Sequence, residues 1–287
     1  LLAELGVVRL DERASVYVKE LDRPPTRAIT LRQLLTHSAG LPRENPLRDY
    51  DDGPDLARAR FLAVDPIDAP GARYSYGDLG YLWLGEVVRR VADLPLDRFA
   101  REQIFEPLGM HETMFRLPET LRARAAPTER RKTDNQWIRG EVHDPRAWRL
   151  GGIAGNAGLF STADDLARFA RMLLFQGTLD RARVLTPASV QALTRRERVC
   201  NAWRTPGWDA LSDHSGLRGT LLSDLAYGHG GHTGVSLWID PARDLFVLFL
   251  SNRVHPDGRG HVIRLVGGVT DVVARALPNA AAQDSCA

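Results

Sequence analysis

Hydrophobic positions recur at helical spacing through the middle of the chain. After Asp78, the residues Tyr81, Leu84, Val88 and Val91 lie three or four positions apart, which predicts an amphipathic helix that starts at Asp78. Shorter stretches of the same kind predict further helices near residues 31–37, 55–64, 96–104 and 163–173, and another that starts at Pro187. Thr30 and Thr162 are suited to cap two of them, because a threonine hydroxyl accepts a hydrogen bond from a free backbone N–H of the first turn.

Strand signals are concentrated near the C-terminus. Residues 235–239 and 245–250 are rich in β-branched, aromatic and other apolar side chains, and residues 240–244 between them predict a hairpin. A last helix is predicted near residues 261–277, with an interruption at Gly267 and Gly268. Residues 117–150 have little pattern and predict long loops. Helices in the middle, strands near the end and a final helix suit an α+β architecture.

Composition excludes several classes of protein. The chain has 38 basic and 36 acidic residues in 287, a balance too even to predict a nucleic-acid partner. Two isolated cysteines, Cys200 and Cys286, predict neither a disulfide framework nor a zinc site. The apolar run at 245–250 is far shorter than the ~20 residues that a membrane-spanning helix needs. No signal peptide is visible, and the opening residues are typical of a helix end closed by Gly6.

The stretch Pro70-Gly-Ala-Arg-Tyr-Ser-Tyr-Gly-Asp-Leu-Gly-Tyr81 holds the first candidate site residues. On the residues alone it is a turn followed by Asp78 as the N-cap of the next helix, with partly buried tyrosines. The glycine-rich run at 151–158 is not a phosphate-binding loop, because no lysine follows its glycines.

A second cluster lies in residues 227–241, which include His229 and His232. Its glycines are typical of a strand start where another backbone approaches closely. A metal site made by His229, His232 and either His255 or His143 is a weaker alternative. Neighbouring residues on a strand point to opposite faces, and no acidic ligand lies at a fixed spacing.

Three short motifs in order carry a family resemblance. Ile29-Thr-Leu-Arg-Gln-Leu-Leu-Thr-His-Ser-Ala-Gly-Leu-Pro42 resembles the segment after the first core helix of the penicillin-recognising serine hydrolases. That family includes class C β-lactamases, D,D-peptidases and related esterases. Tyr76-Gly77-Asp78 is similar to its Tyr-x-Asn motif, with aspartate in place of asparagine, and His229-Gly230-Gly231 is similar to its Lys-Thr-Gly or His-x-Gly motif. The resemblance extends from Gly6 to about Leu277.

The resemblance implies a β-lactamase/transpeptidase-like fold of the α+β class, in which helices flank an antiparallel sheet beside an all-helical region. It implies that Tyr76 shuttles protons, that His229 supplies positive charge or hydrogen bonds, and that the main-chain N–H of His232 is half of an oxyanion hole. Tyr76 and His229 are then expected to converge on one spot. A phenol with an ordinary pKa of about 10 needs nearby cations to act as a base at neutral pH.

Other residues receive weaker roles from the resemblance. Asp78, Gly230 and Gly231 would contact the substrate, which is a small ester, a peptide or a β-lactam. His143 and Asp144 could line the substrate cleft. No cofactor and no metal are implied, and the periplasm or cell envelope is favoured over the cytoplasm. The oligomeric state is left open.

The nucleophile of this family is a serine in a Ser-x-x-Lys motif, and no serine among the 287 residues has a lysine three positions later. The resemblance therefore implies a chain that lacks the N-terminal strands and the nucleophile helix. Such a chain is expected to be inactive by itself and poorly soluble, whereas the complete protein would be a serine hydrolase. The alternative is a non-catalytic cell-envelope binding module that has lost the nucleophile.

One β-lactamase-related domain is predicted over residues 1–287. It comprises a connector at 1–30, a mainly helical region at 31–180, a part with a helix, the strand hairpin and the final helix at 181–278, and a tail at 279–287.

Overall fold

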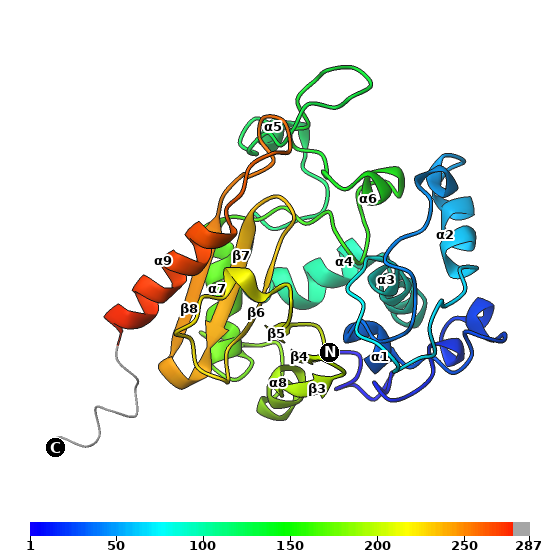
Figure 1. The fold of residues 1–287 in the computed structure, drawn as a ribbon, viewed down its shortest axis with the longest axis horizontal. Helices are drawn as coiled ribbons and strands as arrows, with labels where there is room; N and C mark the ends of the chain where they lie inside the picture. The colour runs from blue at the N-terminus through cyan, green and yellow to red at the C-terminus, as the bar shows by residue number, and fades with distance from the viewer. Residues whose placement is uncertain (278–287) are drawn as a thin grey trace. The chain divides into compact units, whose positions relative to one another are not determined.

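The structure of the chain is a computed structural model that describes residues 1–277 (Figure 1). It contains two compact units. The first unit comprises Leu1–Ala125, Gly140–Ser161 and Val199–Asn201, and the second comprises Ala126–Arg139, Thr162–Arg198 and the chain from Ala202 onward. The predicted tail at 279–287 lies outside the described residues.

The first unit is helical. Its helices are α1 (Leu31–Leu35), α2 (Pro54–Leu62), α3 (Leu79–Ala92), α4 (Leu96–Ala100), α5 (Glu119–Arg122) and α6 (Pro145–Arg149), with 3₁₀ helices at Ala14–Val16, Lys19–Leu21 and Leu47–Tyr50 and a π-helix at Arg101–Phe105. The predicted helices near 31–37, 55–64, 78–91 and 96–104 are thus confirmed. Residues 117–150 are mostly loop, as predicted, apart from α5 and α6.

Helix α1 begins where the sequence predicts and ends earlier. The Thr30 hydroxyl accepts from the Gln33 N–H, and the Gln33 side chain accepts from the Thr30 N–H, which makes a reciprocal capping box. The helix ends at Leu35 because His37 adopts a left-handed conformation, with φ of 55°. A helix cannot continue through such a residue, so the predicted end at residue 37 is wrong.

The buried face of α3 differs from the predicted one. The residues that it buries are Leu79, Leu82, Trp83, Glu86 and Val87, whereas Tyr81, Leu84, Val88 and Val91 are only partly buried. Apolar side chains cover more than one side of this helix, so spacing alone could not select the side that faces the core. Trp83 is fully buried and its indole N–H donates to the carbonyl of Phe61 at 2.9 Å. This large side chain, packed in the core of the first unit, sets the orientation of α3.

The second unit is built on a six-stranded sheet of order β3-β4-β5-β6-β7-β8. The strands are β3 (Glu197–Val199), β4 (Ala202–Arg204), β5 (Asp209–Leu211), β6 (Tyr227–Gly230), β7 (Val235–Asp240) and β8 (Leu245–Leu250), and a separate pair is formed by β1 (Thr178–Leu179) and β2 (Ala182–Arg183). The predicted hairpin is confirmed, since β7 and β8 pair antiparallel with Ile239 opposite Phe246. Strands β3, β4 and β5 were not predicted, because runs of three residues carry no readable alternation.

Two long helices pack on this sheet. Helix α7 (Ala163–Leu174) is capped by Thr162 as predicted, and it lies behind the strands in Figure 1. Helix α9 (Ile263–Ala276) lies on the other face, where its Ala274 joins Trp238, Leu245 and Val247 in one hydrophobic cluster. The third helix of this unit, α8 (Pro187–Thr194), begins at the predicted proline.

Helix α9 is continuous, so the predicted interruption at Gly267 and Gly268 is wrong. A Cβ on Gly267 would lie 2.9 Å from the carbonyl oxygen of Gly216, whereas a Cβ on Gly268 would meet nothing within 4 Å. Gly267 is therefore explained by the close approach of α9 to a neighbouring turn. A glycine costs a helix only about 1 kcal/mol, which tertiary packing offsets.

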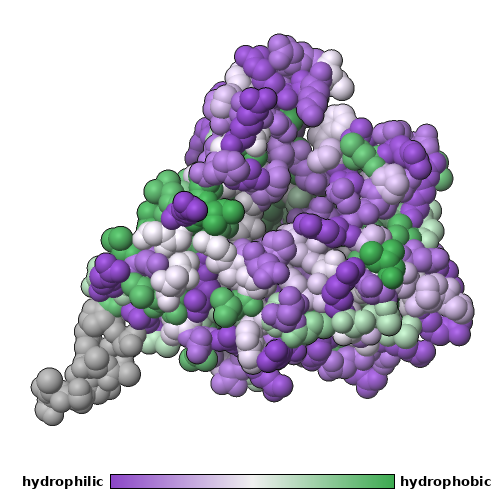
Figure 2. All heavy atoms as spheres, in the orientation of Figure 1, coloured by the Kyte–Doolittle hydropathy of each residue, from purple (hydrophilic) through white to green (hydrophobic). Residues whose placement is uncertain are grey.

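Strand β8 is the last strand of the sheet, and hydrophobic side chains gather near it over α9 (Figure 2). Leu265 and Val272 on α9 are 59% and 65% exposed, and Leu250 at the end of β8 is 46% exposed. Within residues 1–277, no helix combines the length and the apolar character that crossing a membrane requires.

Candidate functional site

The predicted site residues belong to both units. Tyr76 and Asp78 lie in the first unit, and the residues from His229 to His232 lie in the second. Each group is positioned by the contacts within its own unit, and the expected convergence of Tyr76 and His229 stays a prediction.

Tyr76 lies in a loop that is fastened to the segment after α1. Glycine is required at position 77, because a Cβ there would lie 2.5 Å from the Cα and the carbonyl oxygen of Arg43. Backbone hydrogen bonds join the two segments at three further points: Gly71 N–H to the Ser38 carbonyl (2.7 Å), Ser75 N–H to the His37 carbonyl (2.8 Å) and Asp78 N–H to the Arg43 carbonyl (2.8 Å). The backbone on both sides of Tyr76 is thereby held in place.

The ring of His37 lies among tyrosines. Its centroid is 4.6 Å from that of Tyr76, 5.0 Å from that of Tyr81 in a stacked arrangement, and 6.2 Å from that of Tyr74 in an edge arrangement. The Tyr81 hydroxyl donates to the carbonyl of Leu35 at 3.0 Å. The segment that carries Tyr76 is therefore packed as well as hydrogen-bonded.

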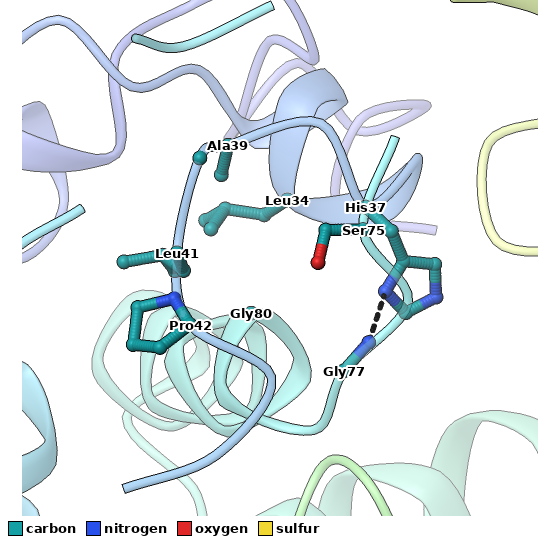
Figure 3. Close-up of a pocket in the computed structure, with 9 residues that line it drawn as sticks. Leu34, His37, Ala39, Leu41, Pro42, Ser75, Gly77 and Gly80 are labelled. Atoms are coloured by element: carbon teal, nitrogen blue, oxygen red, sulfur yellow. Dashed lines mark hydrogen bonds between the residues drawn. The ribbon is translucent and has the colours of Figure 1, made fainter. Parts of the chain in front are cut away.

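A small pocket adjoins this segment (Figure 3). Leu34 and Leu41 line it, and the Ser75 side chain extends between Leu34 and His37. Its volume of about 10 Å³ holds no more than one water molecule. It is a packing defect next to the motif and not a substrate site.

Asp78 occupies the N-cap position of α3, as predicted, but its side chain makes no cap hydrogen bond. The carboxylate instead accepts a hydrogen bond from the side chain of Asn156, which comes from the glycine-rich run at 151–158. Burial is the main cause that raises the pKa of Asp78, and the nearby charge of Asp144 raises it further. Asn156 was not recognised as a site residue; the only signal for it was the glycine run around it.

Asp144 has a structural role. Its carboxylate caps α6 by accepting from the backbone N–H groups of Arg146 at 3.1 Å and Ala147 at 2.7 Å. The buried Arg146 guanidinium donates to the Asn45 carbonyl at 2.7 Å. The suggestion that His143 and Asp144 line a cleft stays a prediction.

In the second unit, His229 lies on β6 opposite Leu237 of β7. Its Nδ1 is 2.8 Å from the carbonyl oxygen of Gly230, and a carbonyl can only accept, so Nδ1 carries a proton. Burial lowers the pKa of His229, and the positive charge of Arg204 lowers it further. A neutral ring protonated on Nδ1 leaves Nε2 as an acceptor. A neutral ring of this kind can take part in hydrogen bonds, and the role of His229 in a reaction stays a prediction.

The charge that faces His229 comes from a buried ion pair that sequence analysis missed. Arg204 at the end of β4 and Asp209 at the start of β5 lie 3.4 Å apart between Nη1 and Oδ1. Asp209 also accepts a hydrogen bond from the Ser215 hydroxyl at 2.7 Å. No pattern in the sequence identifies such a pair, because charged residues in short segments are usually exposed.

His232 lies in the turn between β6 and β7. Gly234 N–H donates to the Gly231 carbonyl at 3.0 Å, and Gly231 N–H donates to the Val235 carbonyl at 2.7 Å. The His232 side chain is exposed and its ring nitrogens are 3.1 and 3.3 Å from Nη2 of Arg253. The imidazole is thus held at the turn, and the oxyanion role of its main-chain N–H stays a prediction.

The glycines of this motif are explained by close approach. A Cβ on Gly230 would lie 2.2 Å from a methyl group of Leu217, and one on Gly231 would lie 2.6 Å from a methyl group of Val235. That Gly230 and Gly231 also contact the substrate stays a prediction.

The weaker metal alternative gains no support. Over residues 1–277, no three His, Cys, Asp or Glu side chains are grouped so that they could hold a metal ion. His255, one of the proposed ligands, has its Nδ1 2.9 Å from the Thr128 carbonyl oxygen and packs against Trp137 at 4.6 Å between ring centroids.

Comparison with known sequences places the chain in a family. The family described as Beta-lactamase matches residues 1–267. The "Putative D-alanyl-D-alanine carboxypeptidase" of Escherichia coli (strain K12) is 29% identical over 286 residues, which cover 87% of this chain and 64% of that protein. The chain thus spans less than two thirds of the length of this curated relative.

Solved structures show the same fold. A family VIII carboxylesterase superimposes with a TM-score of 0.74 at 22% identity, over 96% of this chain and 79% of the esterase. A penicillin-binding protein homologue from Caulobacter crescentus superimposes with a TM-score of 0.71 at 24% identity, over 95% of this chain and 78% of the homologue. These likenesses confirm the β-lactamase/transpeptidase-like fold, and with the match over residues 1–267 they show that this chain belongs to the β-lactamase family.

Proposed function

We propose that these residues are part of a serine hydrolase that cleaves an ester or amide through an acyl-enzyme. The observation that carries the proposal is the neutral His229 ring on the strand of the His-x-Gly motif, with Nε2 as an acceptor, in a chain of the β-lactamase family. The firmly held Tyr76 segment supports it, since a proton-transfer group must keep its position.

In the proposed reaction, a serine outside these 287 residues attacks the carbonyl carbon of the substrate. Tyr76, aided by a lysine near that serine, takes the hydroxyl proton and later delivers it to the leaving alcohol or amine. The main-chain N–H of His232 holds the negative oxygen of the tetrahedral intermediate, and losing one such donor costs about 3–4 kcal/mol. Water then attacks the acyl-enzyme with the same groups acting in reverse. His229 accepts a hydrogen bond beside Tyr76 and fixes its polar surroundings.

We propose a D-Ala-D-Ala type peptide or a small ester as the substrate, ahead of a β-lactam. The E. coli relative is named for a D-alanyl-D-alanine carboxypeptidase, and the superimposed carboxylesterase for ester cleavage. Asp78 stands where the family motif has asparagine, so its side chain is the one that we propose contacts the amide or ester of the substrate, with its pKa raised by burial. A substrate peptide of this kind would place the protein in the cell envelope.

The test uses a longer protein that contains these 287 residues and the preceding Ser-x-x-Lys sequence. Cleavage of a p-nitrophenyl ester should fall by roughly 10²–10⁴ in Tyr76→Phe, the range that general acid–base groups contribute. Tyr17→Phe is the matched control, because the Tyr17 hydroxyl only accepts from the exposed Arg9 N–H. Full turnover in Tyr76→Phe would show that the role given to Tyr76 is wrong.

The second candidate function is a non-catalytic binding module. The observation in its favour is that no serine among the 287 residues begins a Ser-x-x-Lys motif. Covalent labelling by a fluorescent penicillin or a fluorophosphonate separates the candidates. The hydrolase proposal expects labelling of the longer protein and none of these 287 residues alone. A longer protein that binds peptidoglycan fragments but is never labelled would be the binding module.

A further inference from the structure

His37 holds the two residues on either side of Tyr76. Its carbonyl oxygen accepts from the Ser75 N–H at 2.8 Å, and its ring Nδ1 accepts from the Gly77 N–H at 3.4 Å. Figure 3 shows the second of these bonds, from the backbone of Gly77 to the imidazole. The backbone on both sides of Tyr76 is therefore hydrogen-bonded to the same residue, His37. The His37 ring also contacts the ring of Tyr76.

His37 itself has an unusual backbone. His37 is 7% exposed and its φ is 55°, which lies in the left-handed region. Residues other than glycine and asparagine adopt this backbone conformation at a cost of about 1–2 kcal/mol. Two backbone hydrogen bonds hold this conformation in place. His37 N–H donates to the Leu34 carbonyl at 3.3 Å, and Ser38 N–H donates to the Gln33 carbonyl at 2.8 Å. Strain that is held in this way concentrates at functional sites.

The Gly77 bond requires one form of the imidazole. A nitrogen that accepts has a lone pair, so Nδ1 is unprotonated and the proton of the neutral ring lies on Nε2. The doubly protonated ring has no acceptor and would oppose the Gly77 N–H. Three aromatic rings, those of Tyr74, Tyr76 and Tyr81, lie close to the imidazole. This is the opposite tautomer from that of His229, where Nδ1 donates.

We propose that His37 is a positioning residue for Tyr76. In this role it acts through the backbone at residues 75 and 77 and through ring contact, so that the phenol oxygen keeps its direction while protons move. The inference rests on the proposed function of Tyr76. A purely structural role, as an aromatic filler beside Tyr74 and Tyr81, is the alternative, and it does not need an acceptor at Nδ1.

Two substitutions separate the roles. His37→Asn tolerates the left-handed backbone and places a carbonyl oxygen near the position of Nδ1, so it keeps the acceptor and loses the ring. His37→Gly tolerates the same backbone and loses both. Asp93→Gly is the control, because Asp93 is exposed and has φ of 50° at the end of α3. It reports what glycine does at a left-handed position that has no link to Tyr76.

The first measurement uses the 287-residue chain and needs no activity. Nitrogen-15 NMR of the His37 ring should show an unprotonated Nδ1 and a proton on Nε2. The Gly77 amide and the Tyr76 ring resonances should shift strongly in His37→Gly and weakly in His37→Asn, and not at all in Asp93→Gly. A proton on Nδ1, or equal shifts in the Asn and Gly variants, would overturn the proposal whatever the protein catalyses.

The second measurement uses the longer protein and the p-nitrophenyl ester. We expect kcat to fall roughly 10- to 100-fold in His37→Gly with KM unchanged, the range that misplacing a catalytic group produces, and to recover in large part in His37→Asn. A fall no greater than that of Asp93→Gly would leave only the structural role. If Tyr76→Phe retains full turnover, the proposed function fails, and the NMR result still decides whether His37 positions Tyr76.

Discussion

Arg204 and Asp209 form an ion pair that is buried inside the second unit. Their side chains are 0% and 3% exposed and lie 3.4 Å apart, and Asp209 is on β5, the strand next to the one that carries His229. Two charges so deeply buried are tolerated only while they face each other. The pair therefore links the stability of this unit to the environment of the candidate site.

Removing one partner of this pair should be severe. We expect Asp209→Ala to lower the free energy of unfolding by about 3–5 kcal/mol, because the Arg204 charge stays buried without its counter-ion. Urea denaturation measures the effect. Asp55→Ala is the control, since the Asp55 side chain is fully exposed in its contact with Arg58 and surface pairs contribute about 0–1 kcal/mol. Equal losses in the two variants would contradict the importance assigned to burial.

His229 should make the protein less stable in mild acid. Its pKa in the folded chain lies below the ordinary value of about 6.5, mainly through burial, so the unfolded chain binds a proton that the folded chain refuses. Stability from this residue is therefore lost as the pH falls below about 6.5, by no more than about 1.4 kcal/mol per pH unit. The free energy of unfolding should drop less between pH 7.5 and 5.5 in His229→Gln than in the wild type.

A control variant is measured in the same way, by its free energy of unfolding at pH 7.5 and 5.5. His111→Gln, which removes an exposed imidazole, is the control for the loss of a histidine. A steeper dependence in His229→Gln would mean that the pKa of His229 is raised in the folded chain.

Asp78→Asn should stabilise the protein at neutral pH. Burial raises the pKa of Asp78 above its usual 3.8, so ionising it costs the folded chain more than the unfolded chain. The folded chain therefore binds more protons at this carboxyl group than the unfolded chain does, and the stability that it contributes falls as the pH rises above 3.8. Asparagine removes this cost and can still accept from the Asn156 amide. The gain should be visible in the melting temperature at pH 7 and should shrink as the pH is lowered towards 4.

Asp93→Asn controls for the loss of a carboxyl group. Asp93 is exposed, and asparagine suits its left-handed backbone equally well. A lower melting temperature of Asp78→Asn at pH 7 would show that the charged carboxylate is the form that the first unit prefers.

Two adjacent glycines of α9 should respond in opposite directions. Gly268→Ala meets nothing within 4 Å and should raise the free energy of unfolding by about 0.5–1 kcal/mol, because alanine favours the helix. Gly267→Ala places a methyl group 2.9 Å from the Gly216 carbonyl oxygen and should lower it by about 1–3 kcal/mol. Thermal denaturation measures both. Stabilisation by both alanines would mean that α9 does not approach that turn closely.

The apolar surface over α9 should favour self-association. Replacing Leu265 and Val272 with Gln removes two exposed apolar side chains and should raise the concentration at which light scattering begins. The free energy of unfolding should change by less than about 0.5 kcal/mol per site, as at other surface positions. Ile67→Gln, on the other unit and 64% exposed, is the control. If all variants scatter light alike, the α9 surface is not the cause.

Short motifs and helical periodicity were sufficient to predict the fold class and most helices. Periodicity failed for the buried face of α3, because apolar residues cover several of its sides and tertiary packing, including that of Trp83, decides between them. It also failed for β3, β4 and β5, whose three residues each acquire strand geometry from their neighbours in the sheet.

The candidate site was predictable only where a motif marks it. Tyr76 and His229 belong to such motifs, whereas Asn156 reaches Asp78 from a run more than 70 positions later in the chain. The Arg204–Asp209 pair is invisible for a different reason, since two charged residues in the sequence carry no sign of their burial. The role of His37 emerges only from backbone bonds that cross between two loops.

The contacts that fasten the Tyr76 loop use carbonyl and amide groups of the main chain at residues 38, 43 and 75. The exposed side chain of Arg43 is therefore open to replacement without dislodging the tyrosine, whereas Ser38 is buried and its hydroxyl is hydrogen-bonded to that of Thr36. Libraries that vary position 43 could retune what the neighbouring surface recognises while the phenol keeps its anchorage.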